Sequence, residues 1–108
     1  MYSKKFRLAV EETKRKKPKQ TISLPFFLIK VFENEVVHPR FGIIISSAAV
    51  KNAARRNFWR RIIADEIKKS AENQKDILVI VFKKINEATA EEVKEALRTF
   101  GEKIKQNF

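Results

Sequence analysis

The chain has 108 residues, enough for one compact domain and too few for two, so we expect a single domain over residues 1–108. The formal net charge is +11, and all of the excess precedes Ile62. Residues 1–61 hold 15 Lys and Arg against 4 Asp and Glu, whereas residues 62–108 hold 9 of each. Charge concentrated in this way predicts a polyanionic partner, most commonly a nucleic acid, although a basic surface without a specific partner is the alternative.

Cysteine is absent from the sequence, which excludes disulfides and thiolate metal sites. No apolar run approaches the roughly 20 residues that a membrane span needs. The basic N-terminal segment is not followed by the apolar stretch of a secretory signal. We therefore expect a cytoplasmic protein without a membrane partner.

The first half of the chain predicts one helix and three strands. Phe6 and Val10 lie one turn apart on a short first helix, which ends before Pro18. Residues 14–19 form a basic run that is either a solvated loop or an RNA contact. Strands are expected over residues 21–24, 26–32 and 40–46, because these segments are rich in β-branched and aromatic side chains.

The second half predicts a long helix over residues 50–70, an apolar strand over residues 77–82 and a closing helix. Thr89 and Glu92 have the spacing of a capping box at the start of that last helix. Its buried stripe is expected to be Val93, Leu97, Phe100 and Ile104. The order α-β-β-β-α-β-α predicts an α+β fold, an α/β sandwich with helices packed on one sheet.

Residues 51–64 carry the strongest functional signal. On a helix, one face would be apolar and face the sheet, with Phe58, Trp59, Ile62, Ile63 and Ile67. The opposite face would carry Asn57, Arg60, Arg61 and Lys68, with Arg56 at its border. This division predicts a helix that anchors itself to the sheet and offers a basic row to solvent.

Arginine suits phosphate recognition because its planar guanidinium donates two parallel hydrogen bonds and keeps its charge. The amide of Asn57 both donates and accepts, so it can contact a 2′-hydroxyl or a base edge. The residues predicted to bind RNA are Lys51, Asn52, Arg55, Arg56, Asn57, Arg60, Arg61 and Lys68. An ordinary solvated basic helix face is the alternative.

This segment resembles the RNR motif of the bacterial ribonuclease P protein family. Asn52-Ala53, Arg56-Asn57 and Arg60-Arg61 match the core of that motif, and Arg60 stands where the family usually has Lys. The strands on either side, beginning at Arg40 and Asp76, and the closing helix also resemble the family. Phe58 and Ala64 depart from the pattern, because the family usually has Arg at both positions.

The resemblance implies a fold like the second domain of ribosomal protein S5, with a left-handed βαβ crossover. It also implies two partners, ribonuclease P RNA and precursor tRNA, whose 5′ leader lies in a cleft between the first helix and the sheet. Phe6, Phe27 and Phe41 are the predicted leader-binding residues, since aromatic rings stack on bases of any sequence. Core packing is the alternative for each ring.

The sequence offers no protein active site. His38 is the only histidine, and the adjacent acidic pairs Asp65-Glu66 and Glu91-Glu92 diverge on their helices. The resemblance implies that the protein is one component of an endoribonuclease whose RNA subunit performs catalysis with Mg²⁺, held mainly by that RNA. Three alternatives stay open, namely a ribosomal or other structured-RNA-binding protein with an S5-like domain, a DNA-binding protein, which we do not expect, and a protein-only nuclease.

Overall fold

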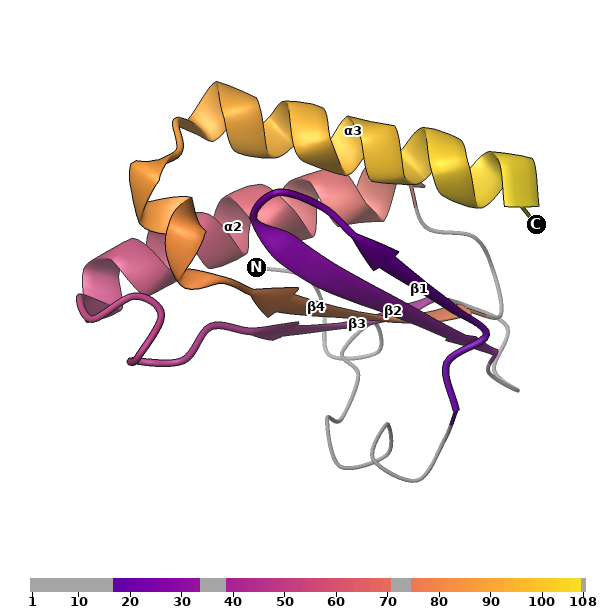
Figure 1. The fold of residues 1–108 in the computed structure, drawn as a ribbon, viewed down its shortest axis with the longest axis horizontal. Helices are drawn as coiled ribbons and strands as arrows, with labels where there is room; N and C mark the ends of the chain where they lie inside the picture. Colours follow the sequence, from indigo (N-terminus) through magenta and orange to yellow (C-terminus); the bar gives the residue numbers. More distant parts are fainter. Residues whose placement is uncertain (1–16, 34–38, 71–74, 108) are drawn as a thin grey trace.

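The fold is a four-stranded sheet with two long helices, seen in a computed structural model that describes residues 17–33, 39–70 and 75–107 (Figure 1). In chain order the elements are β1 (Gln20–Ser23), β2 (Phe27–Glu33), β3 (Arg40–Ile44), α2 (Ala53–Ser70), β4 (Lys75–Val81), the short 3₁₀ helix η2 (Lys83–Glu87) and α3 (Ala90–Asn107). The α+β class and the predicted order from the first strand onward are confirmed. The predicted first helix, with Phe6 and Val10, lies outside the described residues.

The strands lie in the order β1-β2-β4-β3. The β1–β2 and β2–β4 pairs are antiparallel, whereas β3 and β4 run parallel. Helix α2 therefore forms the crossover that a parallel strand pair requires. The left-handed sense of this crossover stays a prediction.

Both long helices lie on the same face of the sheet (Figure 1), and they pack against each other. Register places alternate side chains of each strand toward these helices. The resulting core has strand residues Phe27, Ile29, Val31, Phe41, Ile77, Val79 and Val81 on one side. On the other side it has Trp59, Ile63 and Ile67 of α2 and Val93, Leu97 and Phe100 of α3. The predicted stripe of α3 is confirmed for these three residues, and the side chain of Ile104 is not among those described.

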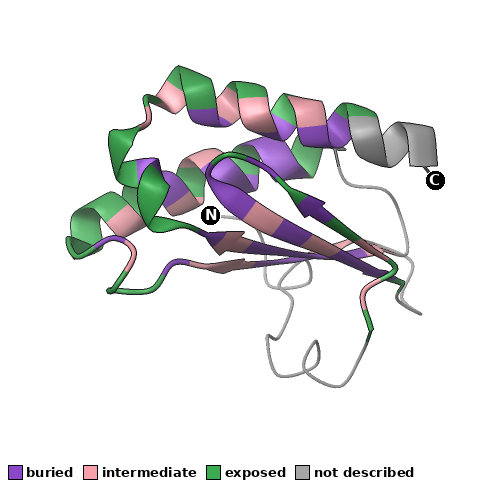
Figure 2. Cartoon of the chain, viewed as in Figure 1, coloured by how far each residue is buried: buried purple, intermediate pink, exposed green. Residues whose placement is uncertain are grey.

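The opposite face of the sheet holds a smaller apolar cluster of Phe32 and Leu78, flanked by the half-buried Ile44 and Ile80. One end of this face is fixed by an ion pair between strands β3 and β4. The Arg40 guanidinium donates from Nε and Nη2 to the two carboxylate oxygens of Asp76, at 2.9 and 2.7 Å. Figure 2 shows the buried residues concentrated along the strands and along the sides of the helices that face them.

Two predicted boundaries are wrong for a local reason. The third strand ends at Ile44 and α2 starts at Ala53, because residues between them form a turn. Ser46 stabilises this turn by accepting hydrogen bonds from the amide of Ala49, through its hydroxyl and its carbonyl oxygen, both at 3.1 Å.

Within the described residues, no helix combines the length and the apolar character that crossing a bilayer requires.

Candidate nucleic-acid interface

At the amino-terminal end of α2, hydrogen bonds join three segments: the turn before the helix, the first turn of the helix and the 3₁₀ helix η2. Asn52 caps the helix, since its Oδ1 accepts the backbone N–H of Arg55 at 3.1 Å. The amide nitrogen of Asn86, in η2, donates to the carbonyl oxygens of Ala49 and Lys83 at 2.7 and 2.9 Å. The turn before α2 and the 3₁₀ helix after β4 therefore form one fixed corner.

Basic side chains emerge from this corner and along the outer face of α2. Arg55, Asn57 and Arg61 are exposed, and Arg60 is half-buried with Nη1 3.5 Å from Oδ1 of Asn57. Lys51 and Lys68, at the two ends, are exposed as well. Within the described part of the chain, none of these cations forms an ion pair with a carboxylate. The predicted row of basic groups is thus presented outward with its charges uncompensated.

Arg56 differs from the other arginines of the motif. Its Nη1 donates to the carbonyl oxygens of Val50 and Lys51, at 2.8 and 2.9 Å. These bonds tie the helix to the preceding turn and occupy one of the three guanidinium nitrogens. Arg56 therefore shapes the corner, and Nε and Nη2 are the nitrogens left for a ligand.

Phe58 was predicted to lie on the apolar face of α2, and this prediction is wrong. The ring is 39% exposed, whereas the neighbouring Trp59 is 1% exposed. Successive residues of an α-helix are turned by about 100°. Because Trp59, Ile63 and Ile67 point into the core, Phe58 is rotated onto the outer face beside the arginines.

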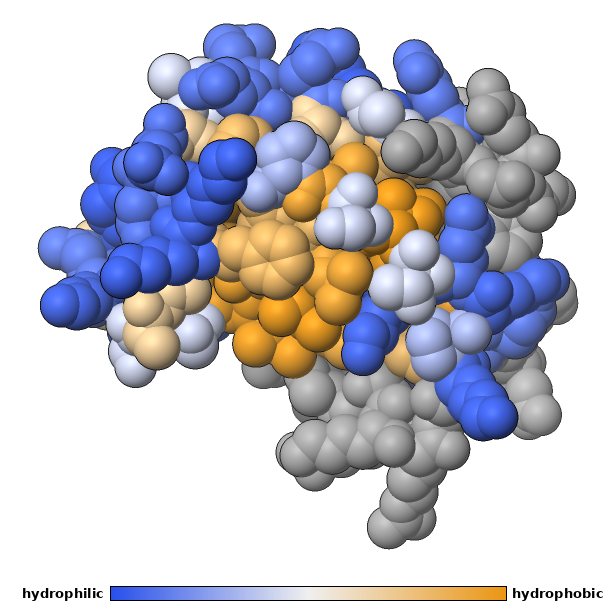
Figure 3. Space-filling view, viewed as in Figure 1, coloured by the Kyte–Doolittle hydropathy of each residue, from blue (hydrophilic) through white to orange (hydrophobic). Residues whose placement is uncertain are grey.

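A pocket of about 290 Å³ opens at the same corner, lined by Ala48, Ala49, Val50, Lys51, Asn52, Arg55, Lys83 and Asn86. Three of these side chains are exposed cations, and Lys83 comes from η2 rather than from the α2 region. Figure 3 shows hydrophilic side chains gathered over the end of the molecule where η2 and the start of α2 lie. Lys83 and Asn86 were missed because η2 was not predicted; the only sequence signal was the pair Lys83-Lys84 directly after a strand.

The helix dipole adds to the positive potential of this corner. The first turn of α2 contains no acidic residue. The partial positive charge of its unsatisfied N–H groups is therefore not neutralised locally. Backbone and side chains together favour an anion at this end of the helix.

The structure corrects the predicted leader-binding residues. Phe27 and Phe41 are 0% and 1% exposed, and both rings belong to the core between the sheet and the helices. A buried ring offers no face to a nucleobase, so the alternative of core packing holds for both. Phe6 lies outside the described residues.

The sheet face away from the helices has a different composition. It carries the half-buried side chains of Leu28, Lys30, Ile44 and Ile80. Neighbouring strand residues point to opposite sides, so these side chains lie on the face opposite Phe27 and Phe41. This surface therefore combines aliphatic side chains with one cation, Lys30, and its described strand residues include no exposed aromatic ring.

Several carboxylates that the structure describes are engaged in ion pairs. Glu33 accepts hydrogen bonds from Nζ of Lys19 and of Lys75 at 2.5 and 2.6 Å. These bonds, first that of Lys19 and then that of Lys75, lower the pKa of Glu33 from 4.5 to about 2. In the described ranges, no three side chains of His, Asp or Glu are grouped so as to bind one metal ion.

Sequence comparisons with known proteins all identify ribonuclease P proteins as similar to this chain. The profile of a family described as Ribonuclease P matches residues 3–105. A ribonuclease P protein component from Aliivibrio fischeri is 31% identical over 75 residues, which cover 68% of this chain and 64% of that protein. The corresponding protein of Aliivibrio salmonicida is 29% identical over 100 residues, covering 89% of this chain and 86% of the relative.

The fold comparison agrees. A solved structure of the Staphylococcus aureus RNase P protein has a TM-score of 0.77 and 28% identity to this chain. The match covers 87% of this chain and 90% of the Staphylococcus protein. The elements described above are thus similar in arrangement to those of a known RNase P protein.

Proposed function

The chain belongs to the ribonuclease P protein family, and from this premise we propose that it binds a catalytic RNA and assists removal of the 5′ leader from precursor tRNA. The observation that carries the proposal is the outer face of α2, where Arg55, Arg60 and Arg61 have no carboxylate partner among the described residues. Phosphate oxygens are the natural partners of such groups.

The docking surface extends from α2 to the corner pocket. Asn57, Arg60, Arg61 and Lys68 contact the RNA along the helix, while Lys51, Asn52, Arg55 and Arg56 contact it at the helix start. Lys83 adds a cation from η2 on the other side of the pocket. An RNA backbone bound here is gripped by two elements that are far apart in sequence, which fixes the orientation of the protein on the RNA.

The protein acts as an endoribonuclease component through charge and positioning. Its cations lower the repulsion between the phosphates of the RNA subunit and those of the substrate as the two approach. Mg²⁺ is assigned mainly to the RNA subunit, which performs the hydrolysis. The residues of this chain bind and orient RNA, and they perform no bond-breaking step.

The leader of precursor tRNA is assigned to the sheet face away from α2 and α3. There Lys30 lies among Leu28, Ile44 and Ile80, all half-buried. The lysine binds the phosphate backbone of the leader, which is the same for every sequence, so a leader of variable sequence is accepted. Phe6 stays a predicted contributor on the first helix.

Reconstitution tests the proposal. Ribonuclease P RNA is mixed with precursor tRNA at low Mg²⁺, with and without the protein, and the rate of leader release is measured. The protein is expected to increase cleavage strongly, and the Arg60→Ala/Arg61→Ala variant to increase it much less. Lys94→Ala/Arg98→Ala removes two cations from α3, is the matched control and should act like the unaltered protein. Failure of the protein to stimulate cleavage would favour another structured-RNA-binding function.

A further inference from the structure

The ring of Phe58 is exposed on the outer face of α2. Of the large apolar side chains that the structure describes, only Phe58 and Phe82 are exposed, at 39% and 38%. Burying such a ring stabilises a fold, so its place on the outer face forgoes stabilisation. An apolar ring exposed at this position is expected to become buried against a partner.

The ring is held in a defined orientation. Trp59 packs against Phe58 edge to face, with 4.9 Å between the ring centroids and 67° between the planes. The guanidinium carbon of Arg55 lies 5.8 Å from the Phe58 centroid and 5.8 Å from the Trp59 centroid. Since Trp59 is anchored in the core, this three-residue cluster fixes the exposed ring before any partner binds.

The surroundings of the ring indicate what kind of partner fits. Arg55 lies three residues before Phe58 and Arg61 three residues after it, so all three share one strip of the helix surface. A protein partner with an apolar patch would have to bring acidic groups to match this charge. An unpaired nucleotide brings a π-face and a phosphate together, and it therefore matches both features of the strip.

We propose that Phe58 is a stacking platform for an unpaired base of the ribonuclease P RNA, with Arg55 and Arg61 binding the phosphates on either side. The inference rests on the proposed function and deepens it. It also explains a departure from the family motif, which usually has Arg at this position. Here a stacking contact replaces a charged one, so this site gains affinity from base contact rather than from counterion release.

The salt dependence of RNA binding distinguishes stacking contacts from phosphate contacts. Phosphate contacts make binding weaken as salt rises, whereas stacking is nearly independent of salt. Phe58→Ala is expected to weaken binding to ribonuclease P RNA by about 5- to 150-fold, the range for one stacked base, without changing the log-log salt slope. Phe58→Trp should bind like the unaltered protein, whereas Phe58→Leu, which is apolar but not aromatic, should resemble Phe58→Ala.

Two controls test whether the effect of Phe58→Ala is specific to stacking at this position. Phe82→Ala removes an equally exposed ring outside α2 and is expected to leave affinity unchanged. Chemical probing of unpaired bases in the bound RNA should show one protection that is lost with Phe58→Ala. The inference is overturned if Phe58→Ala binds normally, or if Phe58→Leu binds as well as Phe58→Trp. If these variants bind normally while Arg60→Ala/Arg61→Ala does not, the proposed function stands; if the unaltered protein fails to bind, both fail.

Discussion

Helices α2 and α3 contain 18 residues each and pack together on one face of the sheet, yet their outer surfaces differ in how charge is arranged. Helix α3 begins with a capping box, in which Thr89 and Glu92 exchange hydrogen bonds of 2.9 and 3.2 Å. Its first turn contains Glu91 and Glu92, which suit the positive end of the helix dipole. Helix α2 has no acidic residue there and places Arg55 and Arg56 close to that end.

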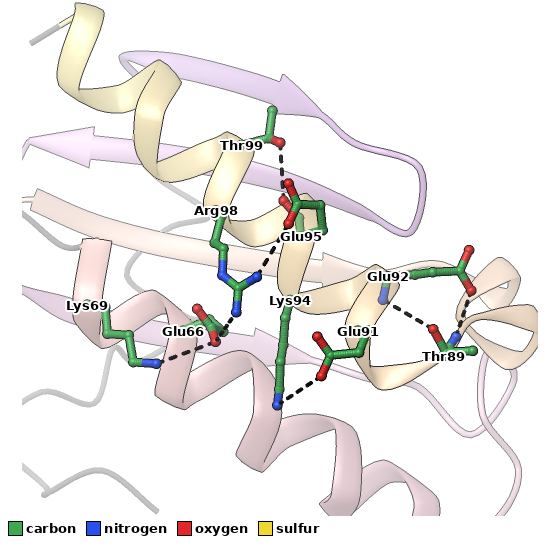
Figure 4. Close-up of polar contacts among 9 residues, drawn as sticks. All are labelled: Glu66, Lys69, Thr89, Glu91, Glu92, Lys94, Glu95, Arg98 and Thr99. Atoms are coloured by element: carbon green, nitrogen blue, oxygen red, sulfur yellow. Dashed lines mark hydrogen bonds and ion pairs between the residues drawn. The ribbon is translucent and has the colours of Figure 1, made fainter.

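The same contrast continues along the outer faces. On α3, Lys94 lies 3.8 Å from Glu91, and Arg98 lies 3.3 Å from Glu95 (Figure 4). Arg98 also reaches the buried Glu66 of α2 at 4.0 Å. Each exposed pair stabilises the fold by at most about 1 kcal/mol, but together they neutralise this surface. On α2, Lys69 pairs with Glu66 at 3.5 Å, whereas Arg55, Arg60, Arg61 and Lys68 have no carboxylate partner among the described residues, so these four charges are available to an anionic ligand.

Truncating a buried side chain on the inner face of either helix is expected to lower the free energy of unfolding by a similar amount. This is the largest effect expected here. Trp59→Ala in α2 and Leu97→Ala in α3 both remove fully buried side chains. Losses of about 3–5 and 2–5 kcal/mol in the free energy of unfolding are expected, respectively. Denaturant titration measures both. A loss below about 1 kcal/mol in α2 alone would mean that the helix is not anchored as described.

Lys83 tests whether the α2 surface includes the corner pocket. Lys83→Ala is expected to weaken binding to ribonuclease P RNA several-fold and to reduce the salt slope by roughly 0.7–0.9, the value for one phosphate contact. Lys94→Ala, a lysine on α3, is the control. Equal slopes for the two variants would remove η2 from the interface.

An acidic residue placed in the first turn of α2 should make that end resemble α3. Ala54 is exposed there. Ala54→Glu is expected to stabilise the fold by about 0.3–1 kcal/mol through the helix dipole and to weaken RNA binding. Ala54→Gln, which carries no charge, should do neither. If Ala54→Glu changed stability but not RNA affinity, the helix start would not face the RNA.

Glu33, at the end of β2, is paired with two lysines, as the cations of α3 are paired with glutamates. The effect of its ion pairs on stability is expected to be the smallest of those considered. Because the pKa of Glu33 is lowered to about 2, its ion pairs contribute stability that is present above pH 4.5 and lost as the pH falls toward 2. The contribution is small, because the pair is solvent-exposed. Unfolding of the unaltered protein and of Glu33→Gln should therefore differ near neutral pH and converge below about pH 2. A difference independent of pH would contradict the ion-pair assignment.

Much of the fold could be predicted from local patterns. The capping box at Thr89 and the apolar stripe of α3 depend on spacing within one helix, which the sequence displays directly. The start of α2 was placed three residues early, at Val50 instead of Ala53. Hydrophobic pattern could not separate the turn from the helix, since the turn depends on hydrogen bonds made by Ser46 and Asn52.

The candidate site was less predictable than the fold. The outward arginines follow from helical spacing, but the bonding of Arg56 to the turn carbonyls depends on where the chain bends before α2. The burial of the strand aromatics Phe27 and Phe41 was not predicted, because a strand that is apolar on both faces has no alternation to separate core from surface. Lys83 joins the surface only through tertiary contact between η2 and the turn, which no local pattern reveals.

The central claim is that α2 keeps its arginines available for RNA phosphates, whereas the described cations of α3, Lys94 and Arg98, are paired with glutamates. The most direct test is the salt dependence of binding to ribonuclease P RNA for two matched double variants. Arg60→Ala/Arg61→Ala on α2 is expected to reduce the magnitude of the log-log slope by about 1.4–1.8, the value for two phosphate contacts, while Lys94→Ala/Arg98→Ala on α3 leaves it unchanged. An identical slope for both variants, or a loss confined to the α3 variant, would contradict the account.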